Sequence, residues 1–261
     1  MSKWISLCIT LLAALLGTLG GCAQPYHAVV KPGVRLSALS PELQGLTDQA
    51  IETYLQAEAR PTFPTAVAIA RLVAPPGYAR FARSDEYAPA LEVPGGDEAA
   101  GWRRLVAGGT QATPAIVDQV QFIGTLLAPG RPTLKSLRDA AALLHAPVLL
   151  VYMQDDDAQS GYNDLAMAYW TIVGLFCVPG HTVGHYAACQ AVLVDTRSGV
   201  VLATAEGEAK REEHVLPGAV DIASDRTARE ARREAVATLQ ANVRDVLAAV
   251  AARSSVRPPG Q

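Results

Sequence analysis

The chain has 261 residues, with 22 Lys and Arg against 25 Asp and Glu, so its formal net charge at pH 7 is −3. Hydrophobic residues make up 50% of it, which allows a sizeable core, and the mild negative charge excludes electrostatic attraction to nucleic acid or to anionic lipids. The sequence contains no P-loop, no G-x-S-x-G elbow and no G-x-G-x-x-G loop, so it lacks the signatures of those nucleotide-binding and hydrolase classes.

The first 21 residues have the order of a secretory signal peptide. Lys3 precedes an apolar run over residues 5–16, small residues follow up to Gly21, and the run is too short for a permanent membrane span. The ending Leu19-Gly20-Gly21-Cys22 resembles the lipobox of bacterial lipoproteins. That resemblance implies cleavage before Cys22 and lipid attachment to it. By resemblance to the sorting of enterobacterial lipoproteins, Ala23 in place of aspartate favours the outer membrane.

The cysteines divide by position along the chain. Cys8 would leave with the signal peptide and Cys22 would carry lipid, which leaves Cys177 and Cys189. An oxidising envelope compartment favours a disulfide between these two, and a pair of reduced, buried thiols is the alternative.

After a tether over residues 22–39, one domain is expected over residues 40–253, followed by a disordered tail over 254–261. In its first half, Ser40-Pro41 begins a helix that runs to about residue 59. Apolar runs predict strands over residues 65–72 and 119–127, and Asp97 caps a short helix that ends near Leu105.

In the second half, Thr133 opens a helix that Pro147 ends, and residues 148–153 form the strongest strand signal in the chain. Residues 155–164, which include three consecutive aspartates, are interpreted as a solvated loop. Strands over 183–194 and 200–205 form a hairpin around Asp195-Thr196-Arg197-Ser198-Gly199, with Gly199 in the left-handed position. Ser224-Asp225 then caps a long helix. The order of elements predicts a single α/β domain with a mixed sheet flanked by helices, a C-terminal hairpin and a long closing helix.

The chain has a helix that ends in the alanine-rich residues 140–146, then an apolar strand, a strand–Asp195-x-x-Ser198-Gly199–strand unit and a C-terminal helix. This order resembles the CsgG and TolB amino-terminal type of envelope domain. The resemblance covers about residues 133–250, and Ser198 stands where those families have threonine. It implies an envelope protein and names no catalytic residue.

The candidate catalytic and metal patterns are weak. His181 and His185 lack the glutamate of a zinc protease helix and are interpreted as turn histidines, although on a strand they would share a face. Asp155, Asp156, Asp157 and Asp164 fail the calcium-loop pattern, because its sixth and twelfth positions fall on Ser160 and Ala166. Cys177 with either histidine would make a thiol nucleophile and base. No metal and no cofactor is expected.

Residues 165–178 are fourteen residues without a charge, which is too short for a membrane span. They are either a buried core segment or a surface that contacts a partner or a bilayer. Under the second interpretation Tyr169, Trp170, Leu175 and Phe176 are the contact residues, since aromatic side chains suit both kinds of interface.

These patterns favour a lipid-anchored envelope protein with a non-enzymatic binding or assembly role at the periplasmic face of the outer membrane. It would be held to the membrane by its N-terminal lipid and would contact an unknown envelope protein or further copies of itself, with no nucleic acid involved. The alternative is a lipid-anchored periplasmic hydrolase or thiol enzyme.

Overall fold

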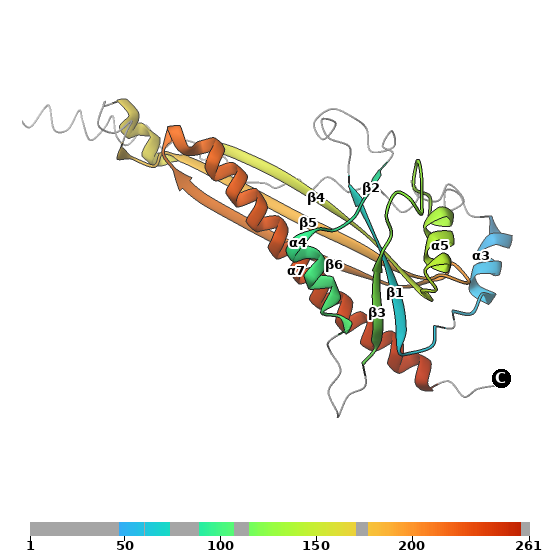
Figure 1. Cartoon of the computed structure of the whole chain (residues 1–261). Helices are drawn as coiled ribbons and strands as arrows, with labels where there is room; N and C mark the ends of the chain where they lie inside the picture. The colour runs from blue at the N-terminus through green and yellow to red at the C-terminus, as the bar shows by residue number, and fades with distance from the viewer. Residues whose placement is uncertain (1–46, 60, 74–88, 107–114, 171–176, 257–261) are drawn as a thin grey trace, which may run out of the picture.

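The computed structural model describes residues 47–59, 61–73, 89–106, 115–170 and 177–256. Its centre is a mixed six-stranded sheet in the order β2-β1-β4-β5-β6, with β3 also paired to β1 (Figure 1). The strands are β1 (Thr65–Val73), β2 (Ala90–Glu92), β3 (Val117–Phe122), β4 (Val148–Tyr162), β5 (His181–Asp195) and β6 (Val201–Val215). The helices are α3 (Asp48–Gln56), α4 (Gly96–Arg103), α5 (Leu134–Leu143) and α7 (Val220–Val256), with 3₁₀ turns η3 (Asp164–Trp170) and η4 (Pro217–Ala219).

Strand direction divides the sheet into two parts. β1 pairs in parallel with β3 and β4, whereas β4, β5 and β6 pair antiparallel to one another. The parallel part carries helices on both faces, as parallel sheets in general do. The architecture is therefore the single α/β domain that the sequence predicts, with its hairpin and long closing helix.

Each face of the sheet has its own core. On the α7 side, β-strand residues such as Val67, Leu150 and Leu193 pack with Trp102 of α4 and Leu239 of α7. On the α5 side, Leu72, Leu149 and Val151 pack with Leu137 and Ile123. The alternation of inward-facing side chains follows from the two-residue period of a strand.

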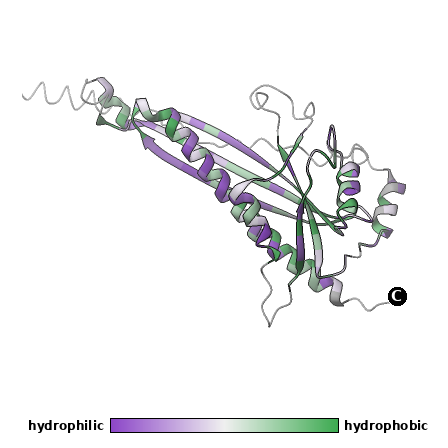
Figure 2. Cartoon of the chain, viewed as in Figure 1, coloured by the Kyte–Doolittle hydropathy of each residue, from purple (hydrophilic) through white to green (hydrophobic). Residues whose placement is uncertain are grey.

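The last three strands are much longer than the others and extend beyond the helices α4 and α5 (Figure 1). Each of β4, β5 and β6 has 15 residues, which corresponds to about 50 Å of extended chain. We call the part with β1, β2, β3, α4 and α5 the body. We call the projecting part (residues 154–162, 181–190 and 206–215, with the overlying first half of α7) the arm. Figure 2 shows hydrophobic residues concentrated in the strands of the body, whereas hydrophilic residues are frequent along the arm.

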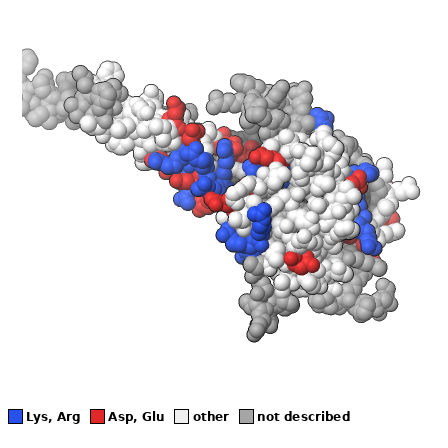
Figure 3. Space-filling view, in the orientation of Figure 1, with Lys and Arg blue, Asp and Glu red and all other residues white. Residues whose placement is uncertain are grey.

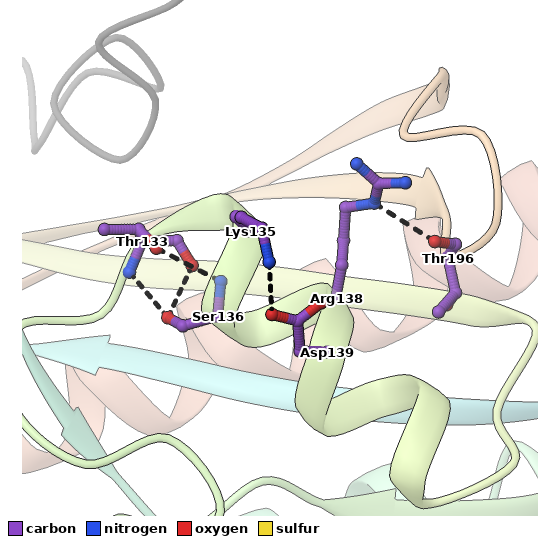
Figure 4. Close-up of polar contacts among 6 residues, drawn as sticks. All are labelled: Thr133, Lys135, Ser136, Arg138, Asp139 and Thr196. Carbon is purple, nitrogen blue, oxygen red and sulfur yellow. Dashed lines mark hydrogen bonds and ion pairs between the residues drawn. The ribbon is translucent and has the colours of Figure 1, made fainter.

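The hairpin turn between β5 and β6 is fastened to α5. The Asp195 carboxylate accepts hydrogen bonds from the Ser198 hydroxyl (2.7 Å) and the Arg197 N–H (3.2 Å), and Gly199 has φ of 78°. The Arg138 guanidinium of α5 donates to the Thr196 carbonyl (3.0 Å) (Figure 4). The Asp195-x-x-Ser198-Gly199 motif is therefore a structural turn, in which a hydroxyl at position 198 is sufficient.

Helix α5 begins as predicted. The Thr133 side chain accepts from the Ser136 N–H (3.1 Å), and the Ser136 hydroxyl oxygen accepts from the Thr133 N–H (2.9 Å), which completes a reciprocal cap (Figure 4). At its end, His145 adopts φ of 52°, and the Ala146 N–H donates to the Ala141 carbonyl (2.9 Å). The helix thus stops before Pro147 by a backbone motif.

Several predicted boundaries are wrong. Residues 155–162 are not a loop, because β4 continues through them and pairs with β5 as far as Tyr162. β3 ends at Phe122, and residues 125–127 form a turn instead of strand. The N-cap of α4 is Gly95, without a side-chain cap from Asp97, and α7 begins at Val220, ahead of Ser224. Of the first predicted helix, the structure describes α3, and residues 40–46 lie outside the described residues.

Candidate functional site

The far end of the arm is formed by Tyr162 at the end of β4, by η3 (Asp164–Trp170) and by His181 at the start of β5. We call this unit the tip. In Figure 1 it lies at the extreme end of the long strands, away from the body. It occurs in the longest stretch of the chain that is nearly free of charge, because Asp164 is the only Asp, Glu, Lys or Arg between Asp157 and Asp195.

Asn163 holds the tip on the strands. Its N–H donates to the Gly180 carbonyl (2.9 Å), its side-chain amide donates to the Pro179 carbonyl (2.9 Å), and its side-chain oxygen accepts from the Leu165 N–H (3.0 Å). Gly180 allows η3 to approach closely, since a Cβ there would lie 2.6 Å from both Ala166 Cα and the Tyr169 ring. The turn is therefore specifically seated, by polar and steric contacts together.

Three rings pack against one another within the tip. The centroids of Tyr162 and His181 are 4.3 Å apart, those of Tyr169 and His181 are 5.9 Å apart, and the two tyrosines meet edge to face at 6.4 Å. Such tilted and edge-on arrangements are favourable for aromatic pairs. These ring contacts hold these aromatic side chains of the tip in fixed positions.

The outer side chains of the tip are exposed. The exposed fractions are 73% for Tyr162, 53% for Leu165, 43% for Met167 and 95% for Trp170, and η3 has no buried residue. The interpretation of this stretch as buried core is therefore wrong for Asp164–Trp170. Tyr169 is half-buried beneath the turn, and Leu175 and Phe176 lie outside the described residues.

Behind the tip, the arm is strongly charged. Ion pairs connect α7 to the strands at Arg211–Glu234 (2.8 Å), Arg232–Asp156 (2.6 Å) and Arg226–Glu213. Figure 3 shows acidic and basic side chains gathered along the arm, whereas the described surface beyond them, toward the tip, is uncharged on this face. The arm is thus charged along its length, whereas the tip at its far end exposes mainly apolar and aromatic side chains.

The two histidines do not form a metal site. Both lie in β5, so the interpretation as turn histidines is wrong, and the structure places His181 in the tip and His185 against α7. His185 is 5% exposed, and its Nε2 lies 3.0 Å from the Ser224 hydroxyl oxygen. Burial lowers the pKa of His185, so it is a neutral hydrogen-bonding group at pH 7. Across the described ranges, no cluster of three His, Cys, Asp or Glu side chains is placed to hold a metal ion.

The expected disulfide is absent from this structure, since both Cys177 and Cys189 are free. Extended strand from His181 to Cys189 spans about 26 Å, and the chain from His181 back to Cys177 recovers at most roughly 14 Å of it. The Cα atoms therefore remain beyond the roughly 7 Å that a disulfide tolerates. Burial raises the pKa of the Cys189 thiol to about 12, so this thiol stays protonated and is a poor nucleophile.

A polar network that the sequence did not indicate lies between body and α7. The Glu98 carboxylate of α4 accepts hydrogen bonds from Arg71 of β1 (2.9 Å) and from the Tyr152 hydroxyl of β4 (2.6 Å). The Gln240 amide of α7 donates to the Glu98 carbonyl (3.1 Å). Burial raises the pKa of Tyr152, which keeps it a hydrogen-bond donor. The network joins four elements that are far apart in sequence, and its geometry serves their positioning.

None of the helices in the described part of the chain is long and apolar enough to cross a membrane.

No protein-family model and no curated protein matches the chain. Similar solved structures include a PelC dodecamer from Paraburkholderia phytofirmans (12% identity, 73% of this chain and 92% of that chain, TM-score 0.31). They also include lipoprotein GNA1162 from Neisseria meningitidis (10% identity, 64% and 97%, TM-score 0.29) and the LpoB C-terminal domain from Salmonella enterica (11% identity, 60% and 90%, TM-score 0.27). At these identities and TM-scores, the similarity assigns no function to the chain.

Proposed function

We propose that the chain is a lipid-anchored protein of the bacterial envelope with a non-enzymatic binding or assembly role. Its signal peptide (residues 1–21) is removed, Cys22 carries the lipid, and the domain faces the periplasm at the outer membrane. The tip is its contact surface. The observation that carries the proposal is a charged arm that ends in an exposed turn rich in apolar and aromatic residues, with Asp164 as its single charged residue and Trp170 95% exposed. Isolated apolar residues on a surface are ordinary, but a contiguous exposed patch marks contact.

A lipid anchor at Cys22 would support this role, because the segment that follows it determines how far the domain can reach from the membrane. The predicted tether over residues 22–39 can extend to roughly 60 Å, so the domain can reach targets well away from its point of attachment. Two or three acyl chains bind a membrane firmly, whereas one binds only marginally. The lipid would therefore supply the attachment, and the tip would supply the specific contact.

Metabolic labelling tests the anchor. Labelled palmitate should enter the wild-type chain and be absent from the Cys22→Ser variant, and equal labelling of both would contradict lipidation at Cys22.

Photo-crosslinking in intact cells tests the tip. A photoreactive amino acid at position 170 should give abundant adducts, either with protein or with lipid. The same amino acid at position 126, where Leu126 is 97% exposed on the body, is the matched control and should give few. Equal adduct yields at the two positions would remove the tip from the proposed function.

A further inference from the structure

We infer that the occupant of the tip is the interfacial layer of a lipid bilayer. The inference rests on the proposed function, because it names the partner of the same surface. The tip would dip into the headgroup region of the membrane and fix the direction of the arm relative to it, while the body stays in the aqueous phase.

The first argument is chemical. Trp170 and Tyr162 are the most exposed large hydrophobic residues of the tip, at 95% and 73%, and Trp and Tyr are the side chains that favour the boundary between headgroups and acyl chains. Leu165 and Met167 add apolar surface beside them. Tyr162 and His181, whose ring centroids are 4.3 Å apart, carry polar atoms as well as apolar faces, which suits a boundary better than a dry interior.

The second argument is electrostatic. Within the described part of the tip, Asp164 is the only formally charged residue, and the ion pairs of the arm begin behind it, with Glu213–Arg226 and Asp156–Arg232. Charged groups are costly in the acyl region and stable in water. The decrease in charge from the arm to the tip, where Asp164 alone is charged among the described residues, therefore matches the change from water to membrane along the same direction.

The third argument is one of area. Complete covering of Tyr162, Leu165, Met167 and Trp170 would remove roughly 550–600 Å² from water, which is less than the roughly 800 Å² per partner in a stable protein interface. Among the described residues, these four side chains alone therefore offer less area than one side of a standard protein interface. A bilayer imposes no such minimum when acyl chains on the same molecule already confine it to the membrane surface.

The tryptophan content allows a direct test. After removal of the signal peptide, the chain retains Trp102, which is fully buried, and Trp170, which is exposed at the tip. The full-length chain, processed and lipidated in cells, would be reconstituted into phosphatidylcholine vesicles whose acyl chains carry bromine, a short-range quencher of tryptophan fluorescence. We expect quenching and a shift of emission to shorter wavelength in the wild type. The Trp170→Phe variant leaves only Trp102 and defines the unquenched baseline.

Substitutions that keep Trp170 as the probe separate insertion from proximity. The Leu165→Glu/Met167→Glu double variant should lose the quenching down to the Trp170→Phe baseline, because two carboxylates would have to enter the interface. The Leu126→Glu variant, which also replaces an exposed apolar side chain with a carboxylate but lies on the body, should keep the quenching. Since the net charge of the protein is negative, adding phosphatidylglycerol to the vesicles should not increase the quenching.

Absence of quenching in the wild type, or equal quenching in the double variant, would overturn the bilayer as occupant. Protein adducts in place of lipid adducts from position 170 would also overturn it, yet would leave the tip as the contact surface of the proposed function. Loss of both quenching and adducts would overturn the two proposals together.

Discussion

The body and the arm reach stability by different means. The body buries large side chains on both faces of a partly parallel sheet, including Trp102, Ile69, Leu137 and Leu150, each with an exposed fraction of zero. Beneath the first half of α7, the arm buries small residues, among them Ala187, Cys189, Ala209, Ala231 and Ala235. Because these side chains are small, α7 lies close to the strands of the arm, and ion pairs connect α7 to these strands. An arm that buries little area per residue can be long and narrow, which is the shape that carries the tip away from the body.

The largest expected effect of a single substitution lies in the body. Trp102 packs against Tyr152, with ring centroids 5.1 Å apart, and is fully buried. Trp102→Ala should lower the free energy of unfolding by about 3–5 kcal/mol, because it removes this burial and leaves a cavity. Urea unfolding followed by circular dichroism measures the change. Leu126→Ala, at a 97% exposed site, is the control and should change it by no more than about 0.5 kcal/mol.

In the arm, the substitution with the largest expected effect on stability is at Gly207, where the packing leaves no room for a side chain. A Cβ on Gly207 of β6 would overlap the Ala235 carbonyl and the Leu239 amide of α7, which are backbone atoms that cannot swing away. Gly207→Ala should therefore cost about 1–3 kcal/mol. Gly161→Ala, where a Cβ would meet nothing within 4 Å, is the matched control on the same arm. Equal stability of the two variants would contradict close packing of α7 on β6.

The contrast also explains what the sequence could predict. In the body, residues 148–153 and the Thr133 cap carry strong local signals, and both were predicted correctly. In the arm, Asp155, Asp156 and Asp157 resemble a loop, yet they lie in β4 because their backbone pairs with β5, and Asp156 is paired with Arg232 of α7. Such long-range partners leave no local pattern. The Cys177–Cys189 error has the same origin, since closeness in sequence along a straight strand becomes distance in space.

The candidate site was predicted only in outline. The absence of charge over residues 165–178 marks the tip in the sequence, but it is compatible with a buried segment too. What decides between the two is that Asn163 and Gly180 seat η3 at the end of the arm, beyond any covering element in the described part of the chain. The polar network around Glu98 had no sequence signal, because its partners come from β1, β4 and α7.

Lowering the pH should reduce the stability of the fold by a smaller amount, and the group responsible should lie in the arm. His185 of β5 is buried against Ser224 of α7, and burial lowers its pKa below the ordinary 6.5, with the nearby charges of Asp156, Asp157, Asp225 and Arg232 as secondary influences. The unfolded chain therefore binds a proton at this position more readily than the folded chain does. The stability of the fold should fall as pH drops below about 6.5, until the lowered pKa is passed.

Urea unfolding at pH 7.5 and at pH 5.5 tests the role of His185. His185→Gln should reduce the difference in stability between the two pH values, whereas His214→Gln, at an exposed position, should leave it as in the wild type. If His185→Gln retains the full acid sensitivity, the group responsible lies elsewhere.

The smallest effect on stability is expected at the tip, where the body-to-arm contrast ends. Trp170 is 95% exposed, so Trp170→Glu places its carboxylate in water and buries no unpaired charge. The free energy of unfolding should change by no more than about 0.5 kcal/mol, as for a neutral surface substitution. The melting temperature should therefore stay close to that of the wild type. A buried Trp170 would give the opposite result, because an unpaired carboxylate in the interior destabilises by several kcal/mol. A large fall in melting temperature would therefore show that the turn is part of the core, and the contact role of the tip would lose its principal residue.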